Sequence, residues 1–195
     1  MNQSSTKSCL VVIDMINGFI QQGPLADPSI ASIIGSIETL IKQFKQHDWP
    51  IIALVDQHRE DAKEFQAFPA HCIKASEESE LVDQLKPYQQ DMVMLAKNSV
   101  NGFLAPDFIA WFEQQPSYKQ YVITGCVTDI CVLSFAMTLQ AYIHQHQLDS
   151  EVIVVADGVD TFTTLTHDKA TYHNMALAMM KQIGISIKLA KELYD

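Results

Sequence analysis

Basic residues are scarce in this chain, which has 13 lysine and arginine residues against 23 aspartate and glutamate residues and a formal net charge of -10. They form no cluster along the sequence. A protein that binds nucleic acid needs a basic surface to neutralise phosphates, so the composition argues against that partner. The apolar run before Asp14 is short, and neither a signal peptide nor a membrane span is predicted. We therefore expect a cytoplasmic protein that binds neither nucleic acid nor membrane.

Cysteine is also sparse, and the chain has four: Cys9, Cys72, Cys126 and Cys131. Only the last two lie close together in the sequence, and a reducing compartment favours free thiols over disulfides. Apolar residues make up 48% of the chain and charged residues 18%, which is the balance of a folded protein. With 195 residues, we expect a single domain spanning residues 1–195.

Six short runs rich in valine, isoleucine and leucine alternate with segments of helical period. The runs predict buried strands over residues 9–13, 51–55, 92–96, 121–124, 152–156 and 185–189. The clearest helical stripe consists of Ile30, Ile33, Ile34, Ile37, Leu40, Ile41 and Phe44. This alternation predicts a three-layer, doubly wound α/β domain with a mostly parallel six-stranded sheet. Residues 57–77 lack a clear period, and an irregular segment of that length is usually functional.

Polar side chains follow four consecutive predicted strands, at the edge of the sheet where α/β proteins bind ligands. They include Asp14, Asp56, Lys97 and Cys131. A single aspartate after a strand most often caps a helix or turns the chain, and we keep this interpretation for Asp157. An acid, a lysine and a cysteine at neighbouring strand ends instead indicate a catalytic triad.

Cys131 is predicted to lie in the first turn of a helix. Thr128 or Asp129 is expected to cap this helix, and free backbone donors there would lower the pKa of the thiol, as would Lys97. The same donors could stabilise an oxyanion. The alternative is that Cys131 is a buried structural thiol.

Three segments of the chain, IDMINGF, LAKNSVNGF and TGCVTDICV, resemble the signature segments of the isochorismatase-like cysteine hydrolases, in the same order. The resemblance implies that Asp14, Lys97 and Cys131 form the catalytic triad of this family. It also implies a cis peptide bond between Cys126 and Val127, which would direct the backbone NH groups of Val127 and Cys131 toward one oxygen.

The segment DQHREDAKEFQAFPAHC resembles the metal-binding segment of the nicotinamidase subgroup. By this resemblance Asp56, His58 and His71 are metal ligands, and Glu64 matches a fourth ligand found in some nicotinamidases. Carboxylates and imidazoles together suit one divalent transition metal, with zinc as the first choice and manganese or iron as alternatives. The alternative is that these side chains only face solvent.

Two phenylalanines, Phe19 and Phe68, match aromatic positions of the nicotinamidase substrate pocket, whereas Val100 occupies a position where a tyrosine often stacks on the substrate ring. Phe19 could equally belong to the core.

The resemblance implies hydrolysis of a small amide through a thioester on Cys131, with nicotinamide converted to nicotinate and ammonia as the first candidate reaction. An alternative reaction acts on a carbamoyl or ureido compound, which the absence of a tyrosine at Val100 favours. An alternative of another class is a catalytically silent, redox-sensing binding module that uses Cys131 and Cys126. The family resemblance also implies a homo-oligomer.

Overall fold

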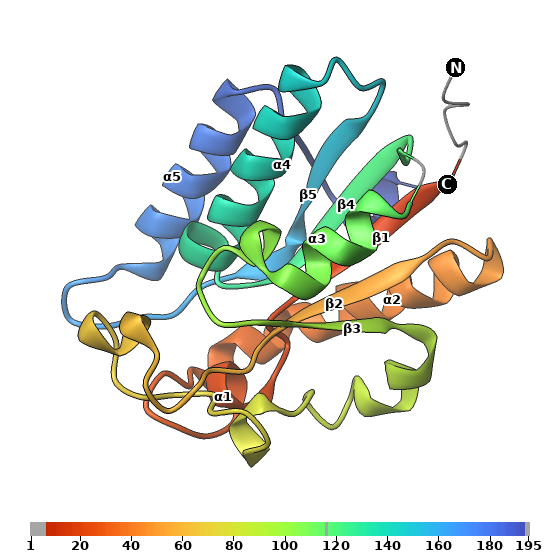
Figure 1. The fold of residues 1–195 in the computed structure, drawn as a ribbon. Coiled ribbons are helices and arrows are strands. Elements are labelled where there is room, and N and C mark those ends of the chain that lie inside the picture. The colour runs from red at the N-terminus through yellow and green to blue at the C-terminus, as the bar shows by residue number, and fades with distance from the viewer. Residues whose placement is uncertain (1–6, 116, 194–195) are drawn as a thin grey trace.

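The computed structural model describes residues 7–115 and 117–193. Its centre is a six-stranded sheet of order β3-β2-β1-β4-β5-β6, in which every neighbouring pair is parallel (Figure 1). The strands are β1 (Ser8–Ile13), β2 (Ile51–Asp56), β3 (Val93–Lys97), β4 (Gln120–Cys126), β5 (Glu151–Asp160) and β6 (Ser186–Lys188). The predicted fold class is therefore confirmed, and the sheet is parallel throughout.

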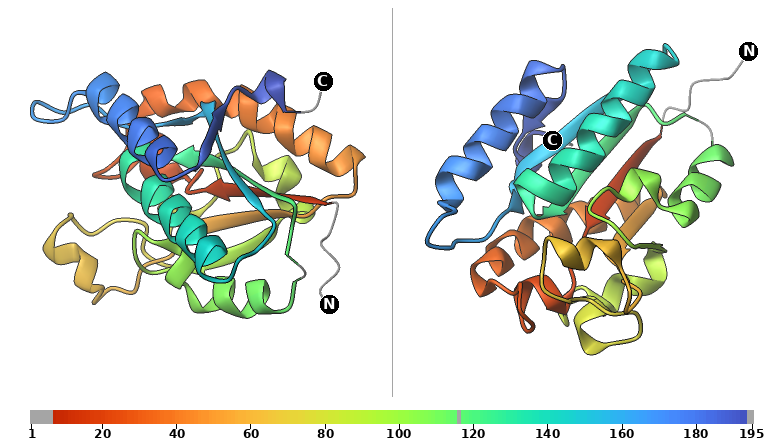
Figure 2. Two further views of the ribbon diagram at one scale, coloured as in Figure 1. Left: turned by 90° about the horizontal axis from the view of Figure 1, so that it is seen from above. Right: turned by 60° about the vertical axis from the view of Figure 1, so that its left-hand side comes forward.

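Helices cover both faces of this sheet, as the views in Figure 2 show. The helices are α1 (Asn17–Ile20), α2 (Ile34–Gln46), α3 (Pro106–Glu113), α4 (Leu133–Gln145) and α5 (Lys169–Gln182). Short 3-10 turns span Pro28–Ile33, Lys63–Gln66, Glu77–Ser79, Lys86–Asp91, Gly102–Leu104 and Ala190–Glu192. Helix α2 packs on one face, and α3, α4 and α5 lie on the other. Among the helices of the described ranges, none has the length and apolar character that a membrane span requires.

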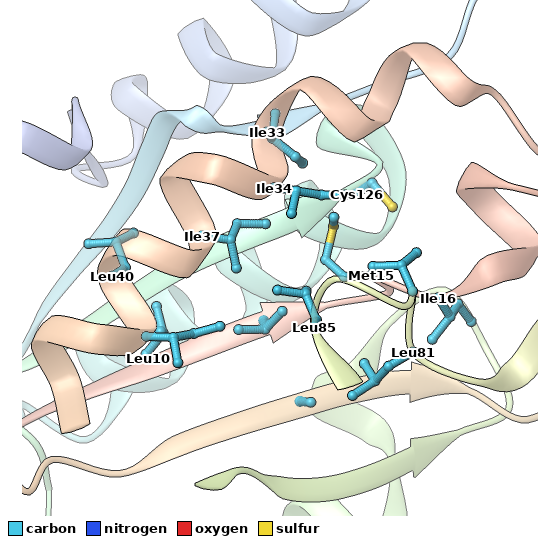
Figure 3. Packing of buried hydrophobic residues seen from close by; sticks show 14 of the residues in the cluster. Leu10, Met15, Ile16, Ile33, Ile34, Ile37, Leu40, Leu81, Leu85 and Cys126 are labelled. Atoms are coloured by element: carbon cyan, nitrogen blue, oxygen red, sulfur yellow. The ribbon is translucent and has the colours of Figure 1, made fainter. Parts of the chain in front are cut away.

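The core consists of two apolar layers, one on each face of the sheet. Along β1, Leu10 faces the layer beneath α2, whereas Val11 faces the layer beneath α3 and α4, because successive side chains of a strand alternate. Figure 3 shows Ile37 and Leu40 of α2 directed toward the strands. Both are fully buried, and burial of each such side chain stabilises the fold by about 1.5–3 kcal/mol.

Two boundaries differ from the prediction by more than two residues. Ile30 and Ile33 belong to a 3-10 turn rather than to α2, because Asp27 caps the turn with its side chain and Pro28 begins it. Strand β5 continues to Asp160 instead of ending at 156, because its last residues pair with β4 beyond an irregularity in the register. The polar Asp157 is exposed within β5 and accepts a hydrogen bond from Ala190 N at 2.8 Å, which is a structural role.

The irregular segment 57–77 lies beyond the carboxyl ends of the strands, together with α1 (Figure 2, right). The chain just after it is fastened to the end of β1, since Asn17 N donates to Glu80 O and Val82 N donates to Met15 O. Glu78 reaches back into the segment and accepts a hydrogen bond from Cys72 N at 2.8 Å. These contacts hold residues 57–77 over the edge of the sheet where the predicted site residues lie.

Candidate active site

Lys97 contacts both of the other residues of the predicted triad. It is the last residue of β3, and its side chain extends over the neighbouring strands. Its Nζ lies 2.6 Å from Asp56 Oδ1 and 2.8 Å from Asp14 Oδ2, and it is 3.9 Å from the Sγ of Cys131. Asp14 directly follows β1 with a positive φ of 52°, and its Oδ1 accepts a hydrogen bond from Asp56 N. The structure therefore brings Asp14, Lys97 and Cys131 together.

Burial and charge pairing set the protonation of this cluster. Burial of Asp14 raises the pKa of its carboxyl to about 7, although Lys97 acts in the opposite direction. Burial disfavours a charged Lys97, but Asp14 and Asp56 outweigh burial and raise the pKa of the ammonium well above its ordinary value. Lys97 is therefore charged, whereas the Asp14 carboxyl can exchange a proton near neutral pH.

Cys131 lies in a π-helical turn, Thr128–Val132, that leads into α4. The predicted cap was wrong, because Val127 is the cap residue of this turn and no side chain caps it. The predicted lowering of the thiol pKa was also wrong. Burial raises the pKa of Cys131 well above its usual range, Lys97 only partly opposes this, and Asp14 adds to it. The resting thiol therefore carries a proton that a neighbouring base must remove.

The strand end before Cys131 is sterically tight. The peptide bond between Cys126 and Val127 is cis, as the resemblance implied. Gly125 has a φ of 112°, and a Cβ there would lie 1.9 Å from the carbonyl oxygen of Ile13, so no side chain fits at this position. The Sγ of Cys126 donates to the carbonyl oxygen of Asp14 at 3.1 Å. An oxyanion hole formed by the NH groups of Val127 and Cys131 stays a prediction.

The four predicted metal ligands, Asp56, His58, Glu64 and His71, lie in one cluster in which one donor atom from each residue is within 4.8 Å of the others. The Nε2 of His58 is 3.4 Å from Asp56 Oδ2 and 3.7 Å from Glu64 Oε1, and that of His71 is 3.8 Å from Asp56 Oδ2. The buried Nε2 of His58 has no hydrogen-bond partner. A cation would satisfy this atom, so the donor set fits a transition metal.

Both histidines of this cluster are held by their other ring nitrogen. His71 Nδ1 lies 2.8 Å from the carbonyl oxygen of Pro69, and His58 Nδ1 lies 3.3 Å from Oδ1 of Asn98. Partners of this kind fix the orientation of a ligating imidazole. The sequence prediction missed Asn98, although it directly follows Lys97 at a strand end.

A cavity of about 380 Å³ opens above the triad, and Cys131, Asp56, Glu64 and His71 all line it. The three predicted pocket residues, Phe19, Phe68 and Val100, line it too. The rings of Phe19 and Phe68 lie edge-on to that of His71, with centroids 5.6 and 6.2 Å away. Two further walls were not predicted, and they consist of residues 24–28 and 162–164.

His167 links the second of these walls to the turn that carries Cys131. Its Nε2 lies 2.8 Å from Oδ2 of Asp129, and its Nδ1 lies 3.0 Å from the carbonyl oxygen of Phe162. The imidazole stacks between the rings of Phe162 and Tyr172, with centroids 4.0 and 3.9 Å away. Asp129 also accepts a hydrogen bond from Thr161 Oγ1. We call Asp129, His167 and Phe162 the histidine clamp.

The whole chain is similar to several known proteins. Nicotinamidase 1 of Arabidopsis thaliana is 29% identical over 91% of this chain and 84% of its own length. Among solved structures, N-carbamoylsarcosine amidase of Thermoplasma acidophilum is 26% identical with a TM-score of 0.76, covering 97% of this chain and 99% of that one. Pyrazinamidase of Pyrococcus horikoshii, solved in complex with zinc, is 26% identical with a TM-score of 0.77, covering 94% and 99%. Residues 8–188 match the isochorismatase domain, and the chain therefore belongs to the isochorismatase family.

Proposed function

We propose that this protein is a cysteine-dependent amidohydrolase that cleaves the carbon–nitrogen bond of a small amide, with nicotinamide as its first candidate substrate. One observation carries the proposal: Lys97 holds Asp14 and contacts Cys131 at the base of a cavity whose lining includes three of the four potential metal ligands. The nicotinamidase and pyrazinamidase relatives support the reaction class.

The chemistry assigns a separate role to each member of the triad. Asp14, whose raised pKa suits proton transfer near neutral pH, accepts the thiol proton of Cys131 as the sulfur attacks the amide carbon. The same proton then passes to the nitrogen, which departs as ammonia and leaves a thioester on Cys131. Asp14 next accepts a proton from water as the water attacks the thioester, which releases the carboxylic acid and restores the thiol. Lys97 keeps Asp14 in place throughout.

Asp56, His58, Glu64 and His71 would hold one divalent metal, with zinc first because the Pyrococcus pyrazinamidase was solved with that ion, and with manganese or iron as alternatives. When bound, the metal supplies a Lewis acid at the cavity wall that can hold a heteroaromatic ring nitrogen. This feature favours nicotinamide over an amide without such an atom.

A carbamoyl or ureido compound is the second candidate substrate. Val100 gives the cavity an aliphatic surface at a position that resembles the one where nicotinamidases often have a stacking tyrosine, and one structural neighbour is an N-carbamoylsarcosine amidase. The cavity still contains Phe19 and Phe68, whose apolar rings suit a flat aromatic substrate.

Ammonia release from nicotinamide, compared with benzamide, tests the proposal because the two substrates differ by one ring atom. We expect a large preference for nicotinamide, since a site with a polar partner strongly rejects an analogue that lacks the matching atom. Chelation should abolish the preference, and Cys131→Ala should release no ammonia from either amide. Equal rates would contradict the nicotinamidase assignment, and turnover of a ureido compound alone would favour the second candidate. A protein without amidase activity whose Cys131 oxidises reversibly would support the redox-sensing alternative.

A homo-oligomeric state and a cytoplasmic location remain predictions from the sequence.

A further inference from the structure

The charged side chains of the cavity lining have one sign. Among the described residues that form this lining, Asp27, Asp56 and Glu64 carry carboxylates, and none is lysine or arginine. Asp56 is paired with Lys97, and Asp56 and Glu64 both belong to the proposed metal cluster, where a divalent cation would offset their charge. Asp27 is outside that cluster, and the described lining residues include no lysine or arginine that pairs with it.

Asp27 is held in place by backbone donors from two cavity walls. Its Oδ1 accepts a hydrogen bond from Ser29 N at 2.9 Å, and its Oδ2 accepts one from Thr163 N at 3.0 Å. Partial burial opposes its ionisation, but hydrogen bonds from Ser29 and Thr163, together with the charge of Lys169, outweigh burial and keep the pKa of the carboxyl below its ordinary value. Lys169 is the cation nearby, yet its ammonium is 2.5 Å from Asp160 and lies outside the cavity lining. A fixed negative charge therefore lines the same cavity as Cys131.

We propose that Asp27 is a specificity-determining residue that makes the cavity select neutral or cationic amides and reject amides that carry a carboxylate. This inference rests on the proposed function and narrows it. A carbamoyl amino acid such as N-carbamoylsarcosine carries a carboxylate, whereas nicotinamide is neutral, so the charge separates the two candidate substrate classes. The acid produced by hydrolysis is itself an anion, and the same repulsion favours its release.

Alkylation of Cys131 measures this selection without any assumption about the substrate. Iodoacetamide and iodoacetate are nearly equal in size, and each forms a sulfur–carbon bond and releases iodide, but only iodoacetate is negatively charged. The ratio of their rates at Cys131, located by mass spectrometry and normalised to a free small thiol, reports the charge barrier. We expect Asp27→Asn to lower the iodoacetamide-to-iodoacetate ratio about fivefold at low ionic strength, and we expect salt to shrink the effect. Asparagine is a good substitute at the cap position that Asp27 occupies.

Asp157→Asn is the matched control, because Asp157 also accepts a backbone hydrogen bond at the start of a 3-10 turn but lies outside the cavity lining. Asp157→Asn removes one negative charge, as Asp27→Asn does, and it should leave the iodoacetamide-to-iodoacetate ratio unchanged. An unchanged ratio in Asp27→Asn, or an equal change in Asp157→Asn, would overturn the assignment of charge selection to Asp27.

A turnover measurement separates this inference from the proposed function. The probes are 5-carbamoylnicotinate and 5-nitronicotinamide, because a nitro group has the shape of a carboxylate without its charge. Asp27→Asn should raise the kcat/KM of the carboxylate relative to that of the nitro compound by about fivefold. If neither amide is hydrolysed but the alkylation ratio shifts, the substrate assignment fails and charge selection stands. If nicotinamide is hydrolysed while the alkylation ratio stays constant, the proposed function stands and charge selection is refuted.

Discussion

Replacement of Lys97 by methionine should destabilise the fold as well as abolish activity. The ammonium of Lys97 is 2.6 Å from Asp56 and 2.8 Å from Asp14, and all three side chains are at most 1% exposed. Methionine preserves most of the apolar stem but leaves two buried carboxylates without their cation. Removing one partner of a buried ion pair costs about 3–5 kcal/mol in the free energy of unfolding. For a chain of this size, that corresponds to a fall in Tm of about 10 °C.

Urea unfolding in the presence of a chelator measures this loss without a contribution from bound metal. The matched control is Lys119→Met, because Lys119 and Asp149 form an ion pair of similar length, 2.9 Å, with both side chains at least half exposed. An exposed pair of this kind contributes at most about 1 kcal/mol. The double variant Lys97→Met/Asp14→Asn should be more stable than Lys97→Met alone, since one unpaired carboxylate becomes neutral. Equal losses for Lys97→Met and Lys119→Met would refute the argument.

Three further predictions concern the nucleophile, the metal and the pocket. Cys131→Ala should abolish ammonia release while Cys9→Ala keeps most of it, because Cys9 lies in the core layer beneath α3 and α4; equal activities would contradict the mechanism. Purified protein should carry about one transition metal per chain by elemental analysis, and His71→Ala should lower that occupancy because it removes a ligand atom; full occupancy in the variant would argue against the site. Val100→Tyr should lower the KM for nicotinamide, because ring stacking contributes about 0.5–1.5 kcal/mol; an unchanged KM would show that residue 100 does not contact the substrate.

The sequence predicted β1, β2 and β4 because parallel strands buried on both faces are continuous apolar runs. The edge strands β3 and β6 were predicted to be buried too, but they are partly exposed because each has a neighbour on one side only. The sequence also predicted that Asp14, Lys97 and Cys131 lie close together, since the carboxyl ends of neighbouring parallel strands lie at the same edge of the sheet. The end of β5 was missed because Asp157 and Gly158 interrupt the apolar run, although their backbone continues the strand. Val159 and Asp160 remain in the strand because they pair with Gly125 and Cys126 of β4, even though the residues before them are not apolar.

The remaining features of the site depend on contacts that no local pattern encodes. Asp27 and Thr163 are 136 residues apart in the sequence, and only the folded chain shows that they join two walls of one cavity. The raised pKa of Cys131 likewise follows from burial, which a position at the start of a helix does not reveal. The pattern of strands therefore predicted the residues at strand ends, and the family resemblance predicted Glu64, Phe68 and His71 in the irregular segment. The cavity walls at 24–28 and 162–164 and the protonation of Cys131 could not be predicted.

The histidine clamp has a consequence for how this enzyme family diversifies. His167 contacts both Asp129, which lies near Cys131, and the carbonyl oxygen of Phe162 in the pocket wall, so a substitution in one segment disturbs the contacts of the other. We expect substitutions at positions 129 and 167 to occur together among relatives. A chimera that imports a foreign segment 162–172 should therefore also import residues 128–132, since otherwise the Asp129 carboxylate would face an unrelated side chain. Recombination among relatives therefore has to exchange these two segments as a pair.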